Sequence, residues 1–235
     1  MSFESSNTIH VIIVAAGIGR RFENQNDCPK QYELLGNLPV LVHSILAFDS
    51  ASINSITVVI HPEDTHWKTL TPVVSNHSIH TISGGAQRHD SVRNGIKSLN
   101  ADPHDWVLVH DAARPCVTTD EINDLIDCCL NHQSGGLLVT PLTDTIKYSE
   151  SGESVNKTIN RDNLYAALTP QMFRCGDLLK ALTVFEADSI TDESSAIEAQ
   201  GQKPLMVQGK SSNIKITTYE DLALAQTLLK QQGRI

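Results

Sequence analysis

The chain of 235 residues lacks features that would assign it to several common protein classes. Its five cysteines are odd in number and show no Cys-x-x-Cys spacing, which argues against a disulfide framework or a structural zinc site. No apolar run approaches the ~18 residues of a membrane span. Residues 1–7 have neither the basic nor the apolar segment of an export signal. We therefore expect a cytoplasmic protein with reduced thiols and no membrane contact.

Positive charge is also scarce. The chain has 18 Lys and Arg residues against 27 Asp and Glu residues, and its formal net charge is −9. Such a surface repels nucleic acid and anionic membranes, so we expect neither as a partner. An anionic ligand would need a local cluster of cations.

A glycine turn near the start lacks both common nucleotide-binding fingerprints. It follows residues 9–16, an apolar run too short and too β-branched for a helix. The third glycine of the dinucleotide-binding pattern is replaced by Phe22, and the Gly-Lys-Ser/Thr ending of a P-loop is missing. Small residues such as Gly17 still let backbone N–H groups approach an anion, and the cations Arg21 and Lys30 follow. The stretch is a candidate phosphate site or a plain tight turn.

Apolar patterns alternate between strand and helix along the chain. They predict strands at residues 9–16, 53–60, 79–83, 106–110, 205–207 and 214–216. They predict helices at residues 39–48, 88–99, 118–130, 172–187 and 191–199, and a last helix opened by a capping box of Thr217 and Glu220. This alternation predicts one α/β domain over residues 1–235, with a mostly parallel sheet covered by helices on both faces.

In such sheets, ligands bind beyond the carboxyl ends of the strands. That rule groups the loops at residues 17–30, 84–91 and 111–115 with the segment after residues 135–141. Residues 143–163 are polar and read as a β-hairpin that projects from the body. A two-stranded hairpin is marginal alone, so we expect it to pack against something, such as a second subunit.

Eight short motifs occur in order over nearly the whole chain. They read AAGIGRR at 15–21, CPKQY at 28–32, GGAQRHDSV at 84–92, HDAARP at 110–115, DTIK at 144–147, LTPQ at 168–171, TDE at 191–193 and NIKIT at 213–217. Together they resemble the 2-C-methyl-D-erythritol 4-phosphate cytidylyltransferase family. Position 87 departs from the pattern, since it is Gln where glutamate is usual.

The resemblance implies a Rossmann-like fold of nucleotidyltransferase type and a specific reaction. A cytidylyl group passes from CTP to 2-C-methyl-D-erythritol 4-phosphate, giving 4-diphosphocytidyl-2-C-methyl-D-erythritol and pyrophosphate in the non-mevalonate isoprenoid pathway. It also implies Mg²⁺ as cofactor and a homodimer formed through the arm at 143–163. Both reactants are anions and a phosphate is already a nucleophile, so catalysis needs positioning and cations more than a base.

The family's functional positions carry over to named residues here. The catalytic cations would be Arg21, Lys30 and Lys215. The CTP-binding residues would be Ala15, Ala16, Gly17, Gly85, Ala86, Ser91 and Ala112. The residues binding the polyol phosphate would be Asp111, Arg114, Thr145, Thr169 and Thr191, together with the partner subunit's Arg161. The metal would be held mainly by the CTP phosphates, with Asp111 as a possible ligand.

Other interpretations of the same residues stay open. Asp111 could merely cap a turn, Thr191 could be a helix N-cap, and Asp192 and Glu193 favour the dipole of a helix start. His110 is more often a structural partner than an acid or base.

Rival functions stay open as well. Cytidylyl transfer to ribitol 5-phosphate would use similar CTP loops. A non-catalytic nucleotide-binding module and a Rossmann dehydrogenase are further alternatives, although residues 63–64 lie too far from the glycines to bind a ribose in the latter.

Overall fold

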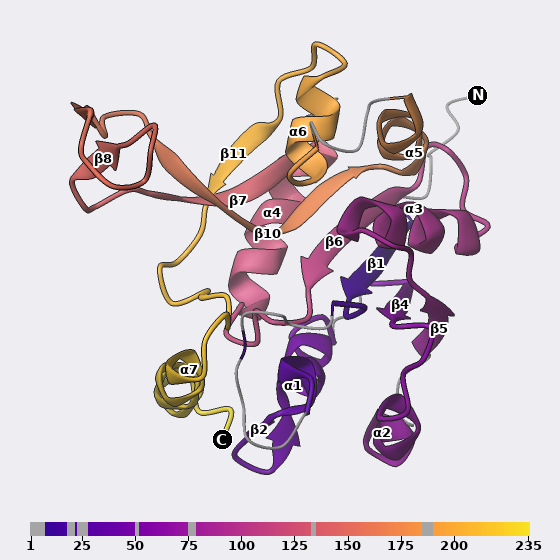
Figure 1. Cartoon of the computed structure of the whole chain (residues 1–235). Helices are drawn as coiled ribbons and strands as arrows, with labels where there is room; N and C mark the ends of the chain where they lie inside the picture. The colour runs from indigo at the N-terminus through magenta and orange to yellow at the C-terminus, as the bar shows by residue number, and fades with distance from the viewer. Residues whose placement is uncertain are drawn as a thin grey trace.

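The computed structural model describes residues 8–17, 22, 28–49, 52–74, 79–132, 135–184 and 190–235. Its centre is a seven-stranded sheet in the order β11-β7-β10-β6-β1-β4-β5 (Figure 1). The strands are β1 (Ile9–Val14), β4 (Ser55–Ile60), β5 (Ile79–Ser83), β6 (Trp106–Asp111), β7 (Gly136–Pro141), β10 (Tyr165–Arg174) and β11 (Leu205–Gln208). Neighbours pair in parallel except at β10, which runs antiparallel to both β6 and β7. The predicted fold class is confirmed.

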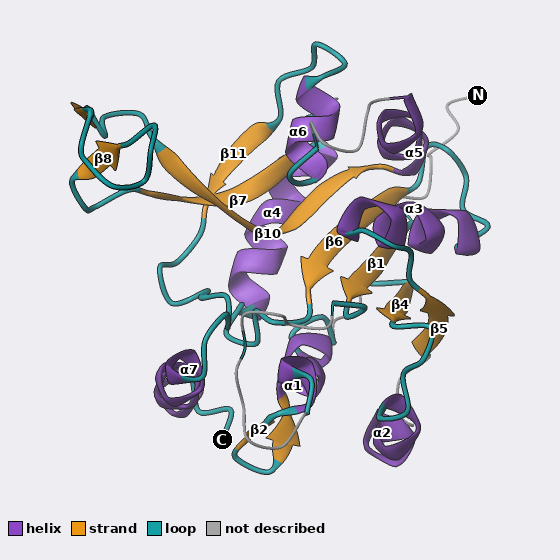
Figure 2. Ribbon diagram, viewed as in Figure 1, coloured by secondary structure: helices purple, strands orange, loops and turns teal. Residues whose placement is uncertain are grey.

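Helices cover both faces of this sheet, and β1 shows why (Figure 2). Val11 and Ile13 join the core that includes α1 (Val40–Leu46) and α4 (Thr119–Leu130). Ile12 points the other way, into the core with α3 (Arg88–Ser98), α5 (Cys175–Val184) and α6 (Glu193–Glu198). Successive residues of a strand face opposite sides, so a strand buried on both sides must be continuously apolar.

The sheet core extends to smaller elements around it. A short helix η1 (Lys30–Tyr32) precedes the strand pair β2 (Leu34–Leu35) and β3 (Leu38–Pro39). Helix α2 (Trp67–Val74), which the apolar pattern did not predict, lies between β4 and β5. Helix α7 (Glu220–Gln231) closes the chain and packs in a third cluster with Leu35 and Ala113.

The polar segment after β7 forms a separate antiparallel pair, β8 (Ile146–Tyr148) and β9 (Lys157–Ile159). Figure 1 shows the β8 segment extending to the left, away from the central sheet. We call residues 143–163 the arm. Among the described residues, no helix is both long and apolar enough to cross a membrane.

Two predicted elements are wrong. Residues 172–174 are not the start of a helix, because β10 runs through them and α5 begins only at Cys175. Met172 packs in one core cluster and Phe173 in the other, and such a doubly buried run gives no periodicity to tell strand from helix. Residues 214–216 are outside any strand; Ile216 N–H donates to the carbonyl oxygen of Ala113 at 2.8 Å.

Helix caps follow the predictions in part. The capping box of Thr118 and Glu121 opens α4 as expected. The predicted capping box of Thr217 and Glu220 is wrong. Thr217 instead donates from its N–H and its hydroxyl to the carboxylate of Asp221. The N-cap of α6 is Asp192 rather than Thr191.

Candidate active site

A cavity of about 820 Å³ lies beyond the carboxyl ends of β1, β4, β5 and β6. It collects many of the predicted site residues, which come from loops far apart in the sequence. These residues are Ala15, Ala16, Gly17, Lys30, Gly85, Ala86, Ser91, Asp111, Ala112 and Lys215. The parallel register explains the convergence, since Val14 of β1 stands beside Asp111 of β6 where both strands end.

The glycine turn and the lysine loop are joined by a buried glutamine. The side-chain amide of Gln31 donates to the carbonyl oxygens of Ala15 at 2.9 Å and Gly17 at 3.2 Å. Gln31 is 4% exposed. Lys30, the preceding residue, donates from Nζ to the carbonyl oxygen of Ile216 at 2.7 Å. The cation is therefore held at the cavity by the turn on one side and the 213–217 segment on the other.

The loop at residues 84–87 approaches β1 and α3 too closely for side chains. A Cβ added to Gly84 would lie 2.5 Å from the Cβ of Ala16 and 2.8 Å from Oγ of Ser91. Gly85 N–H donates to the same Ser91 hydroxyl at 3.1 Å. This packing leaves a narrow cavity wall of backbone groups and short side chains, suited to a flat ring with hydrogen-bonding edges.

Asp111 is the centre of the charged cluster. Its Oδ2 accepts from Lys215 Nζ at 2.7 Å, and its Oδ1 accepts from Nε of Arg88 at 3.0 Å. Nε of Arg114 lies 3.9 Å from Oδ2. Burial would raise the pKa of Asp111, but the charges of Arg88 and Lys215 outweigh it and hold the pKa well below its usual range. The carboxylate is ionised at neutral pH.

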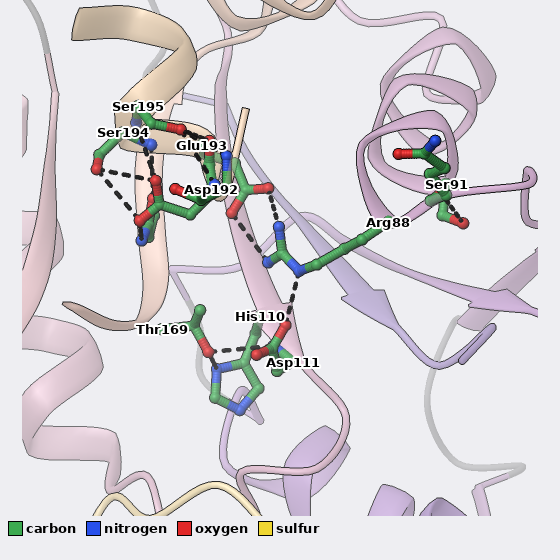
Figure 3. A network of polar contacts seen from close by, with 12 residues as sticks. Arg88, Ser91, His110, Asp111, Thr169, Asp192, Glu193, Ser194 and Ser195 are labelled. Atoms are coloured by element: carbon green, nitrogen blue, oxygen red, sulfur yellow. Dashed lines mark hydrogen bonds and ion pairs between the residues drawn. The ribbon is translucent and has the colours of Figure 1, made fainter. Parts of the chain in front are cut away.

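Arg88 also contacts a second carboxylate, Glu193 at the first turn of α6 (Figure 3). Nη1 donates to Oε1 at 2.6 Å and Nη2 to Oε2 at 3.1 Å. Burial alone would lower the pKa of Arg88, but Glu193 and Asp111 together raise it above its usual value. The guanidinium thus lies between two acids and stays charged.

A hydrogen-bonded chain fixes the backbone below Asp111. The Asp111 N–H donates to the Thr169 hydroxyl at 3.1 Å, and that hydroxyl lies 3.0 Å from Nδ1 of His110. Nε2 of His110 lies 3.1 Å from the carbonyl oxygen of Arg114. A neutral ring satisfies this network by accepting from the Thr169 hydroxyl at Nδ1 and donating from Nε2. Burial lowers the pKa of His110 to about 4, in agreement.

Arg21 lies outside the described residues. Among the described residues, some that were predicted for the site do not line the cavity. Thr145 and Arg161 are exposed on the arm, where Arg161 donates to the carbonyl oxygen of Thr143. Thr191 is exposed, and its N–H donates to Oγ of Ser195 at 3.0 Å. Arg114 and Thr169 contact Asp111 or its backbone directly.

Sequence reasoning missed three residues that shape the site. Arg88 stood inside a recognised motif without an assigned role. Glu193 was interpreted as a residue that favours a helix dipole, but it is 1% exposed and ion-paired to Arg88. Gln31 followed Lys30 in another motif. Arg88 and Glu193 could have been found from one signal: both lie in motifs that the predicted topology places at the same edge of the sheet, and their charges are opposite.

Mg²⁺ would find little protein ligation here. Among the described residues, no group of three or more His, Cys, Asp or Glu side chains could hold a metal ion. Asp111 is one ionised carboxylate at the cavity wall. One carboxylate fits Mg²⁺ when phosphates and water supply the other ligands, as is usual for this ion.

The mostly parallel α/β sheet, with a cation-lined cavity beyond its strand ends, is a nucleotide-binding fold of nucleotidyltransferase type. A family model described as 2-C-methyl-D-erythritol 4-phosphate cytidylyltransferase matches residues 9–231. The chain therefore belongs to the 2-C-methyl-D-erythritol 4-phosphate cytidylyltransferase family, as the eight motifs predicted.

Individual relatives match over almost their whole length. The enzyme of that name from Pseudoalteromonas translucida is 44% identical over 232 residues, which cover 96% of this chain and 92% of the relative. The one from Vibrio parahaemolyticus is 41% identical over 228 residues, covering 95% and 96%. A crystal structure of a 4-diphosphocytidyl-2C-methyl-D-erythritol synthase matches with a TM-score of 0.82 at 34% identity, covering 95% of this chain and 99% of the other. The Francisella tularensis enzyme matches with a TM-score of 0.79 at 36% identity, covering 94% and 100%.

Proposed function

We propose that this protein transfers a cytidylyl group from CTP to 2-C-methyl-D-erythritol 4-phosphate, forming 4-diphosphocytidyl-2-C-methyl-D-erythritol and pyrophosphate in the non-mevalonate isoprenoid pathway. One observation carries this proposal. The family match runs from residue 9 to residue 231, and the cavity at the sheet edge is lined by family-motif residues of the kinds that the reaction needs.

The chemistry follows from the charges. An oxygen of the polyol phosphate attacks the α-phosphorus of CTP and forms the new P–O bond, while the bond to the bridging oxygen breaks and pyrophosphate leaves. The nucleophile is already an anion, so the protein must mainly offset repulsion and charge build-up. Lys30 and Lys215 supply cations at the cavity, and we assign Arg21 to the same role by the family pattern.

The nucleotide and the metal would be held in different ways. The cytidine part of CTP fits the short side chains and backbone groups of Ala15, Gly85 and Ser91. Mg²⁺, when bound, would supply further neutralisation of the triphosphate. We propose that phosphate oxygens hold most of its coordination sphere and that Asp111 is its protein contact.

We further propose a homodimer in which the arm completes the partner's site. Arg161 and Thr145 are exposed on the arm and are not among the residues that line the cavity of their own chain. Apolar side chains are exposed on and beside the arm, with Val155 62%, Tyr165 41% and Tyr148 40% exposed. Buried against a second copy, these side chains would favour association. The partner subunit's Arg161 would then bind the polyol phosphate.

We place the protein in the cytoplasm. The support is the free state of all five cysteines, which suits a reducing compartment.

Product analysis tests the function. The purified protein is incubated with CTP, Mg²⁺ and 2-C-methyl-D-erythritol 4-phosphate, and products are identified by mass spectrometry alongside a coupled pyrophosphate assay. We expect the diphosphocytidyl product with stoichiometric pyrophosphate. Equal turnover of ribitol 5-phosphate would contradict the assigned substrate. Calorimetry that found NAD binding without CTP binding would overturn the whole proposal.

A further inference from the structure

The ion pair of Arg88 and Glu193 is distinctive because the guanidinium donates to two carboxylates of the protein itself. The guanidinium has three nitrogens, and each donates to a carboxylate: Nε to Asp111, Nη1 and Nη2 to Glu193. Arg88 thus bridges the two acids, and Asp111 also pairs with Lys215. Although Arg88 lines the cavity, three of its five N–H donors are used by these carboxylates, which fix the position of the guanidinium.

The pair connects three distant parts of the chain at the sheet edge. Arg88 is the first residue of α3 and directly follows the loop at 84–87, Asp111 is the last residue of β6, and Glu193 is the first residue of α6. In the proposed reaction the first loop faces the nucleotide. The segment just before Glu193 carries Thr191, assigned to the polyol phosphate. Arg88 therefore links the two substrate-binding halves.

The start of α6 is held from its other side as well. The side chain of Gln171, in β10, donates to Oδ2 of Asp192 at 2.8 Å and accepts from Ser194 N–H at 2.8 Å. With Glu193 clamped by Arg88, successive residues of this turn are fixed from two directions. Figure 3 shows Arg88 reaching between Asp111 and the turn that contains Asp192 to Ser195.

The effect on Lys215 follows from the geometry of Asp111. Arg88 holds Oδ1, which leaves Oδ2 directed at the ammonium of Lys215, 2.7 Å away. Without the contact at Oδ1, the Asp111 carboxylate is held through Oδ2 alone, and Lys215 loses a partner whose orientation is fixed. The ammonium is proposed to act on the α-phosphate, where a displacement of about 1 Å is costly.

We infer that Arg88 and Glu193 form a positioning pair: the buried Glu193 carboxylate fixes the Arg88 guanidinium, which sets the Asp111 carboxylate and, through it, the catalytic ammonium of Lys215. This role deepens the proposed cytidylyl transfer and rests on it. Neither residue of the pair needs to touch a substrate.

Two conservative variants test the pair. Arg88→Lys keeps the charge but cannot bridge two carboxylates with three nitrogens. Glu193→Gln keeps the shape and removes the charge, and it carries the test alone if the lysine variant does not fold. Arg93→Lys is the matched control, because Arg93 lies on the same helix, is 29% exposed like Arg88, and pairs with Asp90 outside the cavity.

We expect each test variant to lower kcat by about 10- to 100-fold, with CTP affinity in calorimetry changed by no more than about twofold. The kcat of the double variant should be within about twofold of the kcat of the slower single variant, because both changes remove the same ion pair. Arg93→Lys should turn over like the wild type. Circular dichroism at the assay temperature shows that each variant is folded.

Three results would overturn the inference. They are wild-type kcat in both Arg88→Lys and Glu193→Gln, a loss confined to CTP affinity, and a double variant whose loss is the product of the single losses. In each case an active wild type leaves the proposed function standing. A wild type that makes no product refutes the proposed function, and the positioning role falls with it.

Discussion

The cavity at the sheet edge and the arm differ in how their polar residues are held. In the cavity, Asp111 and Gln31 are buried and each makes several contacts to other loops. On the arm, Thr145 and Arg161 are exposed, and Arg161 donates to the carbonyl oxygen of Thr143, which is on the arm as well. The contacts of the cavity residues fix their geometry before a ligand arrives. The exposed residues of the arm acquire a fixed position only when they pack against another surface.

The two regions therefore divide the work of the proposed site. The part of the proposed site that lines the cavity is preorganised by one folded chain. The part that we assign to the arm would depend on assembly with a second copy. Three predictions separate these halves, and they are given in order of decreasing effect.

Lys30→Ala should lower kcat on the order of 10²-fold or more, because it removes a preorganised cation from the site of charge build-up. The fold should be intact, since the Lys30 side chain lies at a cavity wall and outside the apolar core clusters. Steady-state kinetics measure the loss, and Lys97→Ala, an exposed lysine on α3, is the control. A near-normal rate would remove Lys30 from the mechanism.

Arg161→Ala should raise KM for the polyol phosphate on the order of tenfold, the cost of losing one charge-assisted contact. CTP binding should be unchanged, because Arg161 belongs to the half of the site supplied by the arm. Lys157→Ala, another arm cation, serves as control.

Mixed dimers sharpen this second test. Combining Lys30→Ala subunits with Arg161→Ala subunits should restore one intact site per dimer, built from Lys30 of one subunit and Arg161 of the other. Activity in the mixture should exceed that of either parent. If the mixture stays as slow as its parents, the arm does not act across subunits.

The smallest effect concerns stability in the preorganised half. Burial lowers the pKa of His110 from 6.5 to about 4, so between these values the unfolded chain binds more protons than the folded one. The free energy of unfolding should therefore fall as pH falls, by about 1 kcal/mol between pH 7 and pH 5.5. The pKa of Asp111 is also lowered, from its usual value of 3.8. Asp111 therefore reduces the free energy of unfolding only at pH values below about that usual pKa.

Urea unfolding at several pH values checks this slope. His110→Gln should reduce the slope to the part contributed by His43, whose pKa burial also lowers, and His80→Gln, at an exposed position in β5, should leave it unchanged. A slope that is the same in all three proteins would mean that His110 is not the group responsible.

Much of the fold could be predicted from the sequence because its parallel strands are short, apolar and bounded by glycine or polar loops. Periodicity failed where burial was two-sided, as at Met172 and Phe173 in β10. It also failed at residues 214–216, whose β-prone composition reflects packing of Ile216 rather than strand pairing.

For the site, motifs identified residues by type but could not show partners. Lys30 and Lys215 were predicted from their motifs, and both line the cavity. The Arg88–Glu193 pair was missed because its members are 105 residues apart in the sequence. They meet only at the edge of the folded sheet. Long-range ion pairs of this kind have no local signature.

The continuity of β10 has a consequence for insertions and deletions. This strand begins beside the arm at Tyr165, passes Thr169 and Gln171 at the site, and leads directly into α5. Adding or removing one residue between Tyr165 and Thr169 would change the register of the strand and withdraw the hydroxyl that accepts from the Asp111 amide. The tip between β8 and β9, which is exposed, carries no such constraint. Length variation among related chains should therefore concentrate at the tip of the arm and spare its base.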